Sequence, residues 1–108
     1  MDFENHVALV AVTEETGQKA IVGGGRYVVV QPGKAEVAFL VSDQHQGKGI
    51  GGALLRHLIE IARAAHLQTL SAEVLSENRP MLAVFKKAGL PMNTTLDPDV
   101  VHVTLQLA

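Results

Sequence analysis

The chain has 108 residues, enough for one domain with its own hydrophobic core, and we interpret residues 1–108 as a single domain. Its 19% of charged residues give a formal net charge of −2 with no basic run, which argues against a nucleic-acid-binding surface. No apolar stretch is long enough to span a membrane, and the lack of cysteine excludes disulfides, thiolate metal sites and a cysteine nucleophile. We expect a cytoplasmic protein without a membrane partner.

The first 42 residues contain apolar runs joined by short polar turns, a pattern that predicts an antiparallel meander of strands. One turn is expected at residues 14–19 and another at Pro32-Gly33. Three glycines at 23–25 indicate a bulge, or a point where another backbone or a ligand comes close. The strands predicted here are residues 6–12, 20–30 and 35–42.

From residue 51 the apolar residues change to helical spacing, which predicts a helix to about residue 65. A second helix is expected after Asn78, which can cap it, with Pro80 in its first turn and Gly89 as its end. The remaining predicted strands are residues 69–75, 92–96 and 100–107. The expected fold is therefore α+β, with a mixed, mostly antiparallel sheet in the order β-β-β-α-β-α-β-β.

A glycine-rich segment, QGKGIGG at residues 46–52, lies between the third strand and the first helix. Glycines at this density cost backbone entropy, so they indicate a place where the backbone closely approaches a ligand. The unpaired N–H groups and the dipole of a helix N-terminus both favour an anion there. We interpret the segment as a phosphate-binding turn.

A dinucleotide-binding fold is one alternative, because Gly47, Gly49 and Gly52 match G-x-G-x-x-G and Glu73 follows about 20 residues later. Residues 42–46, however, separate the glycines from their strand, and a meander precedes them instead of a βαβ unit. The chain is also too short for two mononucleotide-binding halves. A P-loop is excluded, because no Gly-Lys-Ser/Thr follows.

The residues 46–51 resemble the Q/R-x-x-G-x-G/A signature of the GNAT N-acetyltransferase superfamily. Downstream, Asn78, Phe85 and residues 87–90 resemble its second conserved block, an asparagine-started helix that ends in a K-x-G-F-like turn. Within the superfamily, residues 35–39 and 100–107 look most like GNAT domains of bacterial protein-lysine acetyltransferases fused to acetyl-CoA-synthetase-like regions. The resemblance covers residues 6–107.

Compared with complete GNAT domains, the chain looks short at its N-terminus, lacking the usual first strand and one or two helices that wall the acceptor site. A fragment of a longer protein, a minimal domain with an open groove, and a subunit completed by a second copy or another partner all fit this expectation.

The resemblance implies acetyl-CoA as co-substrate, with its diphosphate on the backbone amides of the glycine turn. Pantetheine would run beside the strand that ends near Val41, which requires the strand at 69–75 to splay away from it. The implied cofactor-binding residues are Leu40, Val41, Gln46, Gly47, Lys48, Gly49, Ile50, Gly51, Gly52 and Asn78. For Asn78, helix capping and cofactor contact are compatible.

The resemblance also implies transfer of an acetyl group to a primary amine, most closely that of a protein lysine, within a ternary complex. A small-amine acetyltransferase and a silent acyl-CoA-binding module are the alternatives. Glu36 is the implied general base, and a rim glutamate paired with an arginine is the plainer interpretation. Glu73, the second carboxylate within an apolar strand, is more often structural.

One departure from the family pattern concerns the general acid. Many members have a tyrosine in the second-block helix, but Phe85 occupies that position here and its spacing predicts a core residue. Tyr27, the one tyrosine of the chain, is a weak substitute, and water is another. The five histidines show no metal-ligand spacing, so we expect no metal.

Overall fold

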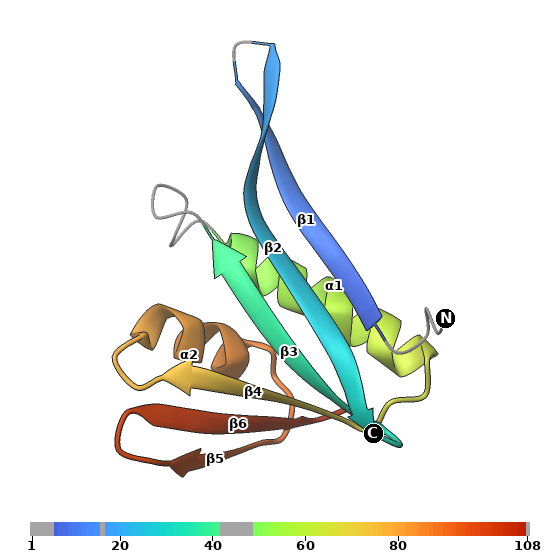
Figure 1. Ribbon diagram of the computed structural model, residues 1–108, viewed down its shortest axis with the longest axis vertical. Helices are drawn as coiled ribbons and strands as arrows, with labels where there is room; N and C mark the ends of the chain where they lie inside the picture. Colours follow the sequence, from blue (N-terminus) through green and yellow to red (C-terminus); the bar gives the residue numbers. More distant parts are fainter. Residues whose placement is uncertain (1–5, 16, 42–48, 108) are drawn as a thin grey trace.

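The computed structural model describes residues 6–15, 17–41 and 49–107, which form a six-stranded sheet and two helices (Figure 1). In chain order the elements are β1 (His6–Glu15), β2 (Gln18–Gln31), β3 (Lys34–Val41), α1 (Ile50–Ala64), β4 (Thr69–Leu75), α2 (Arg79–Lys87), β5 (Met92–Leu96) and β6 (Val100–Gln106). This order confirms the prediction from sequence. Neither of the two described helices is long and apolar enough to cross a membrane.

The β1–β2 hairpin is longer than the sequence predicts. The turn expected at residues 14–19 is wrong in its bounds, because β1 continues to Glu15 and β2 begins at Gln18. Glu14 is the register partner of Lys19, and opposite charges on directly paired residues stabilise an antiparallel ladder. The polar residues therefore extend the strands instead of ending them.

The three glycines of β2 lie where neighbouring groups come close. The register of β1 and β2 shifts between Ala11 and Val12, just before the glycines in β2, so a bulge does occur beside them. A Cβ atom at Gly25 would lie 2.8 Å from ring atoms of Phe39, and one at Gly23 would lie 3.0 Å from the Leu40 carbonyl oxygen. Both interpretations of the glycines, a bulge and a close approach, are confirmed.

Both helices cover the same face of the sheet. The buried core joins Leu55 and Leu58 of α1 and Phe85 of α2 to the residues of the strands that face them. Alternate residues of β3, Ala35 and Val37, belong to this core. Because side chains alternate along a strand, the residues between them point to the opposite, helix-free face.

The strands β3 and β4 form a fork. They are parallel neighbours, but their register covers only Lys34↔Thr69, Ala35↔Leu70 and Glu36↔Ser71, after which the two strands diverge (Figure 1). β3 continues to pair with β2 as far as Val41, while β4 pairs with β6 along its whole length. The expected splaying of the strand at 69–75 away from β3 is confirmed.

Candidate functional site

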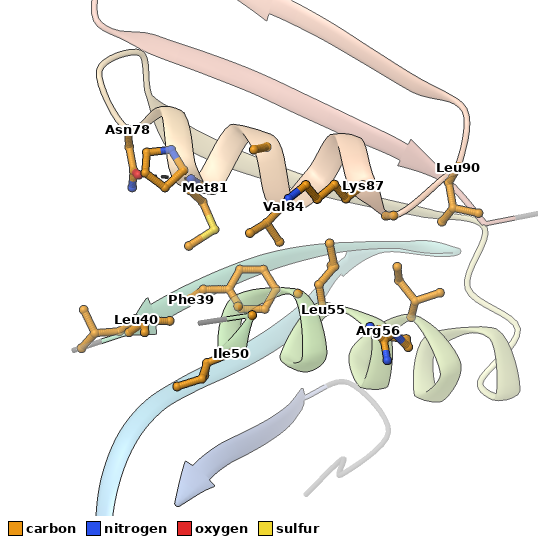
Figure 2. A pocket seen from close by; sticks show the side chains of 18 of the residues that line it. Phe39, Leu40, Ile50, Leu55, Arg56, Asn78, Met81, Val84, Lys87 and Leu90 are labelled. Atoms are coloured by element: carbon orange, nitrogen blue, oxygen red, sulfur yellow. Dashed lines mark hydrogen bonds between the residues drawn. The ribbon is translucent and has the colours of Figure 1, made fainter. Parts of the chain in front are cut away.

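A groove of about 620 Å³ lies between the two helices at the open end of the fork. Figure 2 shows Met81 and Val84 of α2 on one side, Ile50 and Leu55 of α1 on the other, and Phe39 of β3 between them. Its lining is mostly apolar along these elements, with charged side chains added by the later turns of both helices. A concave, largely apolar site with a few polar groups is the usual form of a ligand site.

The structure brings seven of the ten predicted cofactor-binding residues to this groove. They come from the end of β3, the start of α1 and the start of α2: Leu40, Val41, Gly49, Ile50, Gly51, Gly52 and Asn78. The other three predicted residues, Gln46, Gly47 and Lys48, lie outside the described residues.

The N-terminus of α1 opens into the groove. Its N-cap residue, Gly49, has a φ of 83°, and among the described residues neither a side-chain cap nor an acidic residue of the first turn satisfies the helix start. The first main-chain bond of this turn is donated by the Ala53 N–H to the Gly49 carbonyl oxygen at 3.0 Å. The amides before Ala53 therefore form a positive end that suits an anion.

The N-terminus of α2, in contrast, is capped. The Asn78 Oδ1 atom accepts a hydrogen bond from the Met81 N–H at 3.3 Å, and Pro80 lies in the first turn. The predicted capping role of Asn78 is thus confirmed. Because Asn78 also lines the groove, its remaining hydrogen-bonding capacity faces the same space as the start of α1.

The candidate base, Glu36, does not line the groove. It is exposed on the helix-free face of β3 and belongs to the last residue pair before the fork opens, Glu36↔Ser71. Glu73 of β4 lies on this same face, two residues beyond Ser71, the register partner of Glu36. At the fork, the groove therefore lies on the helix-covered face of the sheet, and the carboxylates of Glu36 and Glu73 lie on the opposite face.

Glu73 belongs to a small polar cluster around His102. Its Oε1 atom lies 3.7 Å from the His102 Nδ1 atom, and Asp97 Oδ2 lies 2.8 Å from the His102 Nε2 atom. This arrangement favours the structural interpretation of Glu73. Within the described ranges, no group of three or more histidine, cysteine and acidic side chains could hold a metal ion.

Phe85, at the position of the family's tyrosine, and Tyr27, the possible substitute acid, are both in the core. Phe85 is 1% exposed, and its ring meets that of Phe39 edge to face, with centroids 5.9 Å apart, as its spacing predicts. Tyr27 is also 1% exposed and does not line the groove. Burial raises the pKa of its hydroxyl above the ordinary value, which makes it a weaker proton donor. The geometry therefore argues against Tyr27 as a substitute acid.

Sequence reasoning missed the charged residues of the groove. Arg56, Glu60 and Arg63 of α1 and Lys87 of α2 all line it. The spacing of Arg56, Glu60 and Arg63, at i, i+4 and i+7, puts them on one side of a helix, but this pattern is equally typical of a solvated face. Only the position of α2 beside α1 makes that side part of a site.

Comparison with known proteins gives several matches. The family model of the acetyltransferase (GNAT) family matches residues 2–90. An acetyltransferase of Pseudomonas aeruginosa is 33% identical over 82 residues, which cover 75% of this chain and 44% of the relative.

Solved structures agree with this match. The GNAT domain of S. lividans PAT has a TM-score of 0.79 at 34% identity, over 98% of this chain and 63% of that chain. A cAMP-binding acyltransferase from Mycobacterium smegmatis has a TM-score of 0.79 at 28% identity, over 99% of this chain and 33% of that chain. The chain thus spans less than two thirds of the length of each of these three relatives.

Proposed function

Since this chain belongs to the acetyltransferase (GNAT) family, we propose that it is an acetyl-CoA-dependent N-acetyltransferase. It transfers the acetyl group directly from the thioester to a primary amine, and the amine is that of a protein lysine. Acetyl-CoA acts as co-substrate, and the reaction uses no metal.

The fork between β3 and β4 is the observation that carries this proposal. The β3–β4 register ends at Glu36↔Ser71, so the following residues of β3 form an edge along which a pantetheine arm can lie. The start of α1, which no described side chain caps, is at the same end of the groove and suits the diphosphate. An extended coenzyme fits both features at once.

Glu36 supplies the base in this mechanism. A lysine amine with a pKa of about 10.4 must lose its proton before it attacks, at a cost of about 4–5 kcal/mol at pH 7. Because Glu36 lies at the apex of the fork on the helix-free face, the thioester reaches it by passing between the diverging strands. The carboxylate accepts the amine proton directly or through a water molecule.

A protein lysine suits the open surface around Glu36. This side chain and its strand neighbour Val28 are exposed, and Val28 is 39% accessible. A small amine is better held by an enclosed pocket, because it has few groups with which to be bound. A lysine presented by a protein brings its own docking surface.

A silent acyl-CoA-binding module is the second candidate, and the buried Phe85 favours it. Because residue 85 is a buried phenylalanine, α2 provides no side-chain acid at this position to protonate the leaving thiolate. An enzyme with this sequence protonates the thiolate from water or from the ammonium that forms on the attacking amine.

A turnover panel separates these possibilities. The chain is incubated with acetyl-CoA and either lysine peptides or small amines, and free thiol is measured together with coenzyme affinity. Turnover on lysine peptides is the expected result. Turnover on small amines alone would contradict the lysine assignment, and tight binding without any turnover would favour the silent module.

Replacing Gly49 by alanine tests the glycine turn. An alanine Cβ there lies within 4 Å of no neighbouring atom of the described residues, so the cost arises from the φ of 83° and is about 1–2 kcal/mol of stability. Relief of this strain moves the amides that follow, and we expect coenzyme affinity to fall roughly three- to tenfold, as calorimetry would measure.

The matched control is Gly17→Ala. Gly17 has a φ of 78° and equally open space around its Cβ position, but it lies in the β1–β2 turn, away from the groove. The control therefore carries the same strain with no change in affinity. Equal affinities for the two variants would contradict a role for the α1 amides.

A further inference from the structure

The groove has a positively charged end formed by both helices. Arg56 of α1 and Lys87 of α2 line it from opposite sides (Figure 2), together with Arg63 and Glu60 of α1. Two arginines and a lysine against one glutamate leave a net positive charge. The apolar groove therefore ends in a region that attracts anions.

The charged groups of Arg56 and Lys87 have no polar partner among the described residues. The Arg63 Nε atom donates a hydrogen bond to the Leu107 carbonyl oxygen at 3.2 Å. Arg56 and Lys87, in contrast, form neither an ion pair nor a side-chain hydrogen bond to any described residue, Glu60 included. Two exposed cations that face one groove from two helices are available to a ligand.

The spacing fits the distance between two phosphates of one ligand. Arg56 is four residues after Gly52, which places it about 6 Å further along the helix axis. In coenzyme A, one ribose separates the diphosphate from the 3′-phosphate. A diphosphate at the start of α1 thus brings the 3′-phosphate within reach of long side chains further along the groove.

We propose that Arg56 and Lys87 bind the 3′-phosphate of coenzyme A, an inference that rests on the proposed function. The guanidinium donates paired hydrogen bonds to a phosphate dianion, and the ammonium adds a compact charge from the facing helix. These cations also repel an acceptor amine. The acceptor is thereby directed to the other side of the fork, where Glu36 lies.

The test compares coenzyme A with 3′-dephospho-coenzyme A by calorimetry at low ionic strength. We expect the wild-type chain to bind coenzyme A roughly tenfold more tightly than the dephospho form. In the double variant Arg56→Gln/Lys87→Gln, this preference falls to roughly one- to twofold, because affinity for coenzyme A drops while affinity for the dephospho form is unchanged.

Lys86→Gln is the matched control, because Lys86 is an exposed cation next to Lys87 that does not line the groove. It retains the wild-type preference. A preference retained in the double variant, or no preference in the wild type, would overturn this inference while leaving the proposed function intact. Failure of both coenzymes to bind the wild type would instead reject the proposed function.

Discussion

Replacing Glu36 by glutamine is expected to lower kcat by roughly 100-fold or more, with coenzyme affinity unchanged. The amide keeps the size of the side chain but cannot accept the proton of the attacking amine. Coenzyme affinity is unaffected because Glu36 lies on the helix-free face and does not line the groove. Steady-state kinetics with a lysine peptide, together with calorimetry of acetyl-CoA, measure the two effects separately.

The pH dependence gives this variant a second signature. Without a base, the rate depends on the fraction of acceptor that is already neutral, so kcat/KM rises about tenfold per pH unit below the amine pKa of about 10.4. Glu73→Gln is the control, since Glu73 is an exposed carboxylate on the same face of the neighbouring strand. It should stay within about threefold of wild type. An unchanged kcat for Glu36→Gln would remove Glu36 from the mechanism.

Replacing Phe85 by alanine is expected to lower the free energy of unfolding by about 3–5 kcal/mol. The ring is 1% exposed and contacts Phe39 edge to face, so its loss leaves a cavity where α2 meets β3. A small domain has about 5–15 kcal/mol of stability, so this variant is close to unfolding at 25 °C. Urea titration followed by circular dichroism measures the change.

Lys86→Ala controls for the effect of any substitution in α2. Lys86 is an exposed neighbour in the same helix turn, and its loss should change stability by no more than about 0.5 kcal/mol. A loss below about 1 kcal/mol for Phe85→Ala would mean that the α2 side of the groove is not anchored by this ring.

The sequence predicts the elements of this fold well because its local signals agree. Apolar runs between turns and helical spacing give the order of all strands and helices, and the bounds of β4 and β5 are confirmed to the residue. Asn78, Pro80 and Gly89 predict the extent of α2 because each has a specific capping or breaking role. The first hairpin is misjudged, because the β1–β2 ladder continues through this polar segment, where Glu14 and Lys19 are register partners.

The candidate site is predictable to a smaller extent. A glycine turn before a helix identifies an anion site from local chemistry, and Leu40 and Asn78 join it by family resemblance. The charged end of the groove is not predictable, because Arg56 and Lys87 are 31 residues apart and line the same groove only after the helices pack on the sheet. The sequence likewise does not show which face of the sheet Glu36 lies on. Its place on the helix-free face follows from the burial of its neighbours Ala35 and Val37 on the helix side.

The central claim is that coenzyme A lies in the groove between α1 and α2, with its diphosphate on the first amides of α1. Titration of the 15N-labelled chain with coenzyme A, followed by two-dimensional NMR, tests it most directly. The largest amide shift changes are expected at Leu40, Gly49, Gly51 and Gly52, with little change in β5. No shift changes at saturating coenzyme, or changes confined to the helix-free face, would contradict the claim.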